Sequence, residues 1–376
     1  MKRENNIYPK LISDDNLRLA IIEVNRTHRW RKHHRPNKTV EWVENDIDAR
    51  IIELRTLIEE GFTPSPVKMR NRYDRSAGKW REINEPKLWP DQYIHHALIQ
   101  VLQPAFLRRM DKFCCGSIKG RGPHYGKRYI EKWMHTDVRG TKYCAELDIR
   151  HFYQSLQPEV VMARMRKLIK DYRVLDLIWR IIADGVRIGF YTSQWLANVT
   201  LQPLDKLIRT SENKAAHYIR YMDNFTIFHS NKRKLRRLVK EVEEWLNSHG
   251  LELKGNWQVF PTRSRMPNAL GFRYGRGYTL LRKKTLLRIK RSVAHCYRRL
   301  DAGKSISPKQ ANDVLSSIGG FKHWSSRNVR DRYVRNGVQR TLKSVVRKHS
   351  RKEMMKWSMC SDLSKGAEGR LKTSKQ

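Results

Sequence analysis

Residues Tyr218 to Asn224 read Tyr-Ile-Arg-Tyr-Met-Asp-Asn and stand between two short runs that have the character of β-strands. The runs from His217 to Met222 and from Phe225 to His229 are rich in aromatic and β-branched residues and alternate with a period of about two. A two-residue connection made of Asp223 and Asn224 suits a tight hairpin, because both residue types tolerate positive φ. Taken alone, the two residues could be turn formers and nothing more.

A second acid ends another run of strand-like residues. Tyr143 to Asp148 reads YCAELD, the pattern of a buried strand that ends in a carboxylate. If this strand and the hairpin are neighbours in one sheet, Asp148 and Asp223 come close together. Two facing carboxylates repel each other unless a cation lies between them. Oxygen ligands without Cys or His favour Mg²⁺ over zinc, and two such ions can hold the attacking and leaving oxygens of a phosphoryl transfer.

These two acidic motifs, AELDIRHFY (Ala145 to Tyr153) and YIRYMDN, resemble those of bacterial reverse transcriptases. Between them, GFYTSQWLAN (Gly189 to Asn198) resembles the substrate-positioning motif of that family. Its Ser-Gln pair, where most relatives have Ser-Pro, is similar to the reverse transcriptases of diversity-generating retroelements. The resemblance runs from about Pro64 to Trp324 and so covers most of the chain.

Two positions depart from the family pattern. Asn224 stands where the usual Tyr-x-Asp-Asp motif has its second Asp. Asp91-Gln92 stands where relatives usually have Asp-Arg, so Gln92 removes an expected contact to a nucleotide phosphate.

The resemblance implies an α+β right-hand polymerase fold, with an antiparallel palm sheet flanked by helices. The expected division is an N-terminal basic arm and helix at 1–61, fingers at 62–140, a palm with interleaved finger helices at 141–280, an α-helical thumb at 281–340 and a basic tail at 341–376.

It also implies the activity, RNA-directed DNA synthesis, and the catalytic residues Asp148, Asp223 and Asn224. The metal ligands would be Asp148, Ile149 and Asp223, holding two Mg²⁺ ions, with Mn²⁺ as an alternative. The implied partners are a template RNA, a DNA or RNA primer and dNTPs, with a small accessory protein as a further candidate.

Further contacts follow from the same resemblance. Tyr153 occupies the position at which the family has a bulky side chain that leaves no space for a ribose 2′-hydroxyl. Alternatively, Tyr153 is an aromatic residue of the core near the sheet. Arg81 would contact nucleotide phosphates or be a surface charge on an edge strand. The nucleotide contacts are Arg81, Tyr153, Gln194 and Lys254, and the nucleic-acid contacts are Lys119, Arg121, Arg288, Arg291 and Arg298.

Composition independently favours a polyanionic partner. Lys and Arg number 78 against 37 Asp and Glu, so the net charge is +41. A charge this high repels itself without a partner, and nucleic acid fits better than a small acidic substrate. The hydrophobic fraction of 39% is that of a globular chain rather than a disordered one.

Cysteines and hydropathy indicate the compartment. The five cysteines are odd in number and form no C-x-x-C pair, so we interpret them as reduced thiols rather than disulfides or a zinc site. No apolar run approaches the roughly 18 residues of a membrane helix, and the N-terminus MKRENNIYPK lacks a signal-peptide core. We therefore expect a cytoplasmic protein without a membrane partner.

Local patterns predict the remaining elements. Residues 1–38 are expected to be a partly ordered arm, either solvated or in contact with RNA. The basic residues at 232–237 crowd the start of a helix, against the helix dipole, which indicates a contacted anion. Predicted helices cover Thr39–Glu60, Pro90–Met110, Pro158–Tyr172, Val174–Asp184, a stretch capped by Ser193 and bent at Pro203, Lys232–Gly250 and Lys283–Leu300. Predicted strands cover Val67–Tyr73, Lys79–Ile83 and Leu251–Phe260.

Several biological roles remain open from the sequence. The first is a retroelement-associated reverse transcriptase of the diversity-generating type, and its main rival is an antiviral-defence reverse transcriptase. The short stretch after the thumb disfavours a group II intron maturase. Asn224 and Gln92 also leave open a catalytically impaired RNA-binding or scaffold protein.

Overall fold

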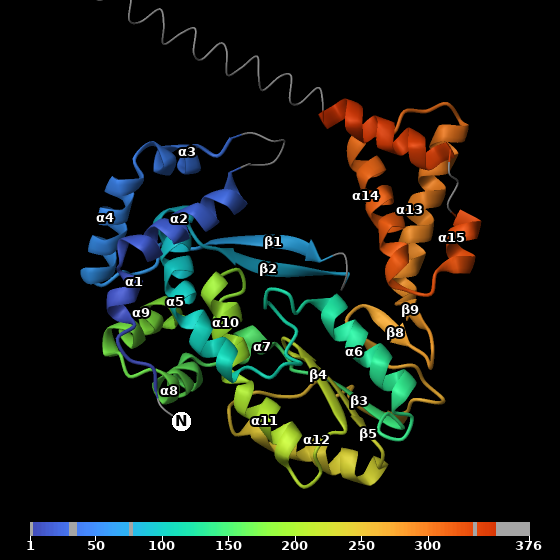
Figure 1. Ribbon diagram of the computed structural model, residues 1–376, viewed down its shortest axis with the longest axis horizontal. Helices are drawn as coiled ribbons and strands as arrows, with labels where there is room; N and C mark the ends of the chain where they lie inside the picture. Colours follow the sequence, from blue (N-terminus) through green and yellow to red (C-terminus); the bar gives the residue numbers. More distant parts are fainter. Residues whose placement is uncertain (1–2, 30–35, 75–77, 334–336, 351–376) are drawn as a thin grey trace, which may run out of the picture. The chain divides into compact units, whose positions relative to one another are not determined.

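A four-stranded antiparallel sheet carries both acidic motifs of the sequence (Figure 1). Its strand order is β4 (His217–Tyr221), β5 (Asn224–His229), β3 (Tyr143–Asp148) and β6 (Gln258–Pro261). In the central pair, Asp148 lies opposite Asn224, and Tyr221 pairs with Asn224 from the other side. The two motifs are therefore neighbours in one sheet, which is the condition that brings Asp148 and Asp223 close together.

The structure is a computed structural model that describes residues 3–29, 36–74, 78–333 and 337–350. The chain divides into two units, Met1–Leu270 and Gly271–Gln376. The first unit holds the four-stranded sheet and its covering helices. Within the described residues, no helix combines the length and the apolar character needed to cross a membrane.

The helix α12 (Lys232–Asn247) covers one face of the sheet and contacts β3, β5 and β6. The apolar residues of the helix recur every three or four positions, which predicted a helix with one apolar face. Five of them are fully buried, and each contributes about 1.5–3 kcal/mol by leaving water. They are Leu235, Leu238, Val239, Val242 and Leu246. The preceding helix, α11 (Gln202–Thr210), packs against α12.

A helical layer is built around α5 (Tyr93–Arg109), which follows a π-helical turn at Leu88–Gln92. The helix α2 (Asp14–His28) packs against α5, as does α10 (Tyr191–Thr200). The layer also includes α1 (Tyr8–Leu11), α7 (Phe152–Ser155), α8 (Pro158–Leu168) and α9 (Tyr172–Ile182).

The prediction of a partly ordered arm at residues 1–38 is wrong for the part of this segment that the structure describes. Ser13 caps α2 by accepting a hydrogen bond from the Asn16 amide, and Leu17, Ile21 and Val24 are fully buried. This helix is part of the core because its apolar stripe packs on α5. Residues 30–35 of the basic cluster lie outside the described residues.

The strands predicted at Val67–Tyr73 and Lys79–Ile83 are confirmed as β1 (Lys68–Asp74) and β2 (Lys79–Glu85), which pair as a two-stranded ribbon. The single helix predicted before it is instead two helices, α3 (Lys38–Asn45) and α4 (Ile47–Glu59). Asp46 causes the break, because its φ of −151° is not helical and its side chain caps α4 by accepting from the Ala49 amide.

Other boundaries differ from the sequence prediction for local reasons. Ser193 does not cap a helix, since α10 already begins at Tyr191 and the Ser193 side chain is buried within it. The predicted bend at Pro203 is a break after Thr200, with Pro203 in the first turn of α11. The predicted helix at 158–172 stops at Leu168, and the predicted strand at 251–260 is reduced to β6. The helix α6 (Pro123–Thr136) and the strand β7 (Asn268–Ala269) complete the unit.

The second unit begins with the paired strands β8 (Phe272–Tyr274) and β9 (Thr279–Leu281). The predicted helix that follows is confirmed as α13 (Lys283–Asp301), with Ile289, Val293 and Cys296 buried. Then come α14 (Pro308–Gly319), a 3₁₀ turn at Gly320–His323 and α15 (Arg327–Tyr333), and residues 337–350 are helical. Residues 351–376 of the expected basic tail lie outside the described residues.

Candidate active site

The β4–β5 hairpin presents Asp223 at its tip. The connection consists of Met222 and Asp223, whereas the sequence had suggested Asp223 and Asn224. Met222 adopts the left-handed conformation, with φ of 56°, and Asn224 is already the first residue of β5. Asn224 is therefore a strand residue beside the turn, and its side chain is exposed.

Asp148 and Asp223 are held together by the backbone. The Ile149 amide, directly after Asp148, donates to the Asp223 carbonyl at 3.1 Å. Burial raises the pKa of the Asp223 carboxyl, and the negative charge of Asp148 raises it further. The Asn224 amide group donates from Nδ2 to Asp223 Oδ1 at 2.9 Å, which opposes that rise. The site thus concentrates negative charge where water is partly excluded.

Lys254 lies on the other side of Asp148. Its backbone amide donates to the Asp148 carbonyl at 2.9 Å, and its ammonium group donates to Asp148 Oδ1. An isolated bridge between Ile149 and Leu253 extends this pairing beyond the end of β3. The family resemblance implied that Lys254 contacts the nucleotide; in the structure its ammonium forms an ion pair with one of the two carboxylates.

The donor set at this site is compatible with a hard divalent cation. The two carboxylates, the Ile149 carbonyl and the Asn224 amide oxygen are the oxygen ligands that Mg²⁺ prefers. Burial and, after it, the charge of Asp148 raise the pKa of Asp223, and a bound cation would relieve the repulsion between the two carboxylates. The described residues contain no group of three or more His, Cys, Asp and Glu side chains arranged to hold a metal. A cation here would accordingly rely on two carboxylates, backbone, amide and ligand oxygens.

Tyr153 lies near this charge. It belongs to α7, which starts directly after His151, a residue in the left-handed conformation with φ of 46°. Burial raises the pKa of Tyr153, and the charge of Asp223 contributes to the rise. The ring packs on Phe152 with 5.3 Å between ring centroids and is half-buried, so one part remains accessible beside the acids.

Gln194 is exposed on a helix whose other residues from Thr192 to Thr200 are all buried. A polar side chain that alone reaches the surface from a buried helix can contact a ligand without disturbing the core. The other faces of α10 pack on α5 and α8.

The loop at residues 116–122 begins next to the turn of the β4–β5 hairpin. Residues 113–115 run beside β4, where the Cys115 amide donates to the Arg220 carbonyl at 2.7 Å. A side chain at Gly116 would place its Cβ 2.8 Å from the Met222 nitrogen, so only glycine allows this approach. Lys119 is exposed on the loop, while Arg121 donates from Nη1 to the Asp111 carbonyl at 3.2 Å and fixes its base.

The other predicted contacts lie on separate elements. Arg81 is exposed on β2, opposite Arg72 in the two-stranded ribbon. Arg288, Arg291 and Arg298 are exposed on α13 of the second unit, away from its buried seam.

A fully buried arginine beneath the hairpin was not recognised from the sequence. Arg220 of β4 has no exposed side-chain area, and the side chain of its partner Asp205 is 2% exposed. The guanidinium donates from Nε to Asp205 Oδ1 and from Nη2 to Asp205 Oδ2, both at 2.7 Å. This is a bidentate pair of charge-assisted hydrogen bonds.

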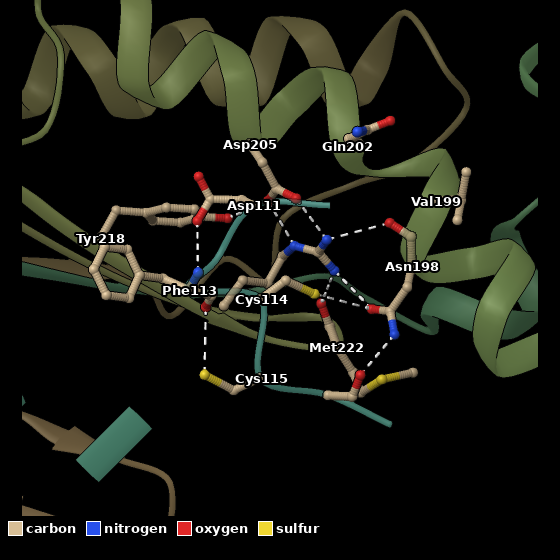
Figure 2. Close-up of polar contacts among 12 residues, drawn as sticks. Asp111, Phe113, Cys114, Cys115, Asn198, Val199, Gln202, Asp205, Tyr218 and Met222 are labelled. Atoms are coloured by element: carbon tan, nitrogen blue, oxygen red, sulfur yellow. Dashed lines mark hydrogen bonds and ion pairs between the residues drawn. The ribbon is translucent and has the colours of Figure 1, made fainter. Parts of the chain in front are cut away.

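The same guanidinium connects three segments. Its Nη1 donates to Asn198 Oδ1 at 2.9 Å and to the Met222 carbonyl at 3.1 Å. Asn198 in turn donates from Nδ2 to the Gly116 carbonyl at 2.9 Å. Figure 2 shows Asp205, Asn198, Cys114 and Met222 converging on this point from α11, α10, the segment at 113–115 and the hairpin. The network therefore joins the helix of Gln194 and the loop of Lys119 to the turn that carries Asp223. The signal in the sequence was a charged residue in the middle of a strand-like run.

These features define a right-hand polymerase fold, with two carboxylates presented by neighbouring strands of an antiparallel sheet. The family model described as "Reverse transcriptase (RNA-dependent DNA polymerase)" matches residues 70–274. The chain therefore belongs to the reverse transcriptase family.

Individual relatives are distant. The chain is 29% identical over 114 residues to the nuclear intron maturase 1, mitochondrial, of Arabidopsis thaliana, covering 30% of this chain and 16% of that protein. It is 24% identical over 182 residues to Protein YkfC of Escherichia coli (strain K12), covering 43% and 47%. It is 24% identical over 294 residues to an uncharacterized 91 kDa protein in the cob intron of Schizosaccharomyces pombe, covering 67% and 35%. The matches span less than half the length of each relative.

Among solved structures, the chain is similar to apo telomerase from Candida tropicalis truncated from the C-terminal domain. The identity is 15% and the TM-score 0.44, with 57% of this chain and 53% of that chain covered.

Proposed function

We propose that the protein is an RNA-directed DNA polymerase that extends a primer on a template RNA. The observation that carries this proposal is the joining of Asp148 and Asp223 through the Ile149–Asp223 hydrogen bond of 3.1 Å, with the raised pKa of Asp223. Family membership supplies the reaction class. Two carboxylates placed in this way serve nucleotidyl transfer better than any chemistry that requires His or Cys.

Asp148, Asp223 and the Ile149 carbonyl would hold two Mg²⁺ ions, with Mn²⁺ as an alternative. When bound, these ions would stabilise negative charge on the reacting phosphate oxygens. Asn224 would act mainly by donating to Asp223 and keeping that carboxylate oriented, with its free amide oxygen as a neutral ligand. Once the Asp148 carboxylate is neutralised by bound Mg²⁺, the Lys254 ammonium would be released from it and would bind the phosphates of the incoming nucleotide.

The remaining residues would position the substrates. Tyr153 would lie under the sugar and exclude a 2′-hydroxyl, Gln194 would contact the nucleotide or its template base, and Arg81 would bind phosphates. In the domain division we propose, the fingers comprise 62–140, the palm 141–280 and the thumb 281–340. The nucleic-acid contacts would come from Lys119 and Arg121 to the template strand and from Arg288, Arg291 and Arg298 to the duplex.

The test is primer extension on an RNA template with each dNTP in turn. Asp148→Ala is expected to reduce extension by at least roughly 100-fold, because it removes a ligand that acts at the reacting atoms. The affinity for RNA should stay within about threefold of the wild-type value, since many basic residues contact the phosphates and this variant leaves them unchanged. The matched control is Asp176→Ala, an exposed acid of α9 whose ion pair with Arg180 is remote from the hairpin. Extension by Asp148→Ala at a rate within threefold of the wild type would reject the assignment.

Two settings for this activity are each supported by a specific observation. The Ser193-Gln194 pair favours a retroelement of the diversity-generating type. The names of two relatives, a maturase of introns and a protein encoded in an intron, favour an intron-associated role as the second candidate. A template repeat and its variable copy beside the gene would support the first, and an intron RNA surrounding the gene would support the second.

A further inference from the structure

The helix α12 carries an uneven charge distribution that the polymerase site does not use. Six of the nine residues from Lys232 to Lys240 are Lys or Arg, and five of these six side chains are exposed. The second half of the helix carries the acids Glu241, Glu243 and Glu244. The basic half, named here the α12 basic face, consists of Lys232, Arg233, Lys234, Arg236, Arg237 and Lys240.

This distribution opposes the intrinsic preference of a helix. The N-terminal end of a helix carries partial positive charge and favours acids, yet the first turn of α12 contains no acid. Within the face, Arg233 is three and four residues from Arg236 and Arg237, the spacing at which like charges repel. The helix forms because its opposite stripe is buried in the core, so the charges are tolerated rather than stabilising.

In the part of the chain that the structure describes, no acid forms an ion pair with these charges. Across the described residues, none of the six basic side chains takes part in an ion pair within 4.0 Å or in another polar contact. The nearest acid along the helix, Glu241, instead accepts from Asn213 Nδ2 at 2.6 Å. An uncompensated cluster of this density is a docking surface for an external polyanion.

The position of α12 separates this face from the predicted primer–template contacts of the first unit. The helix lies along the sheet, against β3, β5 and β6, on the side away from the β1–β2 ribbon (Figure 1). The hairpin tip lies at the end of β4 and β5, and residues 113–115, which lead into the loop at 116–122, run beside the edge strand β4. A nucleic acid bound at α12 would therefore occupy a second surface of this unit.

We propose that the α12 basic face binds the phosphate backbone of RNA, in a part of the template RNA that lies outside the primer–template helix. This rests on the proposed function for the identity of the polyanion. Four of the five exposed residues, Arg233, Arg236, Arg237 and Lys240, cover about 10 Å along the axis, the length of roughly three nucleotides of one strand. A membrane surface fits less well, because the apolar stripe of α12 is buried in the core and cannot enter a bilayer.

The test compares two RNAs of the same primer-binding sequence, one as a short template–primer duplex and one embedded in a long transcript. The test variant carries Arg233→Gln, Arg236→Gln, Arg237→Gln and Lys240→Gln. The control variant loses the same charge at exposed positions of the same unit: Lys10→Gln, Arg166→Gln, Lys167→Gln and Lys170→Gln.

The test variant should bind the long RNA at least about tenfold more weakly near physiological salt, and the slope of log K against log salt should fall by about three, from four lost phosphate contacts. Its affinity for the short duplex should stay within about threefold, as should both affinities of the control variant. Its melting temperature should not fall, since Gln removes charge repulsion at the helix start.

The proposal is overturned if the test variant binds the long RNA with the affinity and the salt slope of the wild type. It is also overturned if the control variant loses as much affinity for the long RNA as the test variant does. Loss of binding to phosphatidylserine vesicles with unchanged RNA binding would assign the face to a membrane and also overturn it. These are binding measurements, so they stand even if the wild type extends no primer, an outcome that rejects the polymerase proposal alone.

Discussion

Replacing Asp205 by Asn should both destabilise the protein and slow extension, because Asp205 neutralises the buried Arg220 beneath the hairpin. The side chains of the pair are 0% and 2% exposed, and two hydrogen bonds of 2.7 Å join them. Asp205→Asn keeps the shape but leaves a buried guanidinium without a counter-charge. Breaking a buried ion pair in this way costs about 3–5 kcal/mol. That is a large fraction of the roughly 5–15 kcal/mol that typically stabilises a folded domain.

The functional effect comes from a different bond of the same arginine. Arg220 Nη1 donates to the Met222 carbonyl, one residue before Asp223. The double variant Asp205→Asn with Arg220→Met has no buried charge and keeps an acceptor for the Tyr218 hydroxyl, so it should be more stable than Asp205→Asn alone. It has lost the donor to the Met222 carbonyl, so its extension rate should stay below that of the wild type by up to about 100-fold. That is the effect of displacing a catalytic group by about 1 Å.

The assay is urea unfolding followed by tryptophan fluorescence, with single-nucleotide extension on the same preparations. Asp176→Asn is the control, because its ion pair with Arg180 is about half exposed and should contribute only about 0–1 kcal/mol. The reasoning is refuted if Asp205→Asn lies within about 1 kcal/mol of the wild type in free energy of unfolding. It is also refuted if the double variant extends primers at the wild-type rate, since the Met222 contact would then have no role.

Three further predictions concern single side chains. Tyr153→Val should raise ribonucleotide incorporation relative to dNTPs in single-nucleotide extension; an unchanged ratio would make Tyr153 a core aromatic. Asn224→Asp should lower the Mg²⁺ concentration for half-maximal extension and Asn224→Ala should raise it, whereas superimposed titrations would make Asn224 only a structural residue. Burial and the neighbouring His96 lower the pKa of His95 to about 3, so the neutral folded form is fully stabilising above pH 6.5 and loses stability as the pH falls towards 3. His95 should contribute a loss of about 1.4 kcal/mol per pH unit below 6.5 to the free energy of urea unfolding, which His95→Met should remove, and equal pH profiles of the two proteins would contradict it.

The sequence was sufficient where a pattern is local. The strand periods around Asp148 and Asp223 predicted a strand at each place, and both are observed as β3 and the β4–β5 hairpin. The apolar spacing in α12 and α13 predicted both helices to within a few residues, because one buried stripe determines a helical face. The excess of Lys and Arg indicated a polyanionic partner without any knowledge of the fold.

Boundaries failed where one polar side chain competes with the apolar pattern. Asp46 divides a predicted helix by capping the next one, and Ser13 starts a helix in a segment that was expected to be a partly ordered arm. Both are capping residues, whose hydrogen bonds to backbone amides outweigh weak helix propensities.

The tertiary structure alone decided the surroundings of the two acids. Arg220, Asp205 and Asn198 come from three elements, and their hydrogen bonds exist only after those elements pack around the hairpin. Lys254 reaches Asp148 from 106 residues away, and burial raises the pKa of Asp223. Desolvation and long-range contacts depend on what surrounds a residue in space, and the order of residues along the chain does not encode that directly.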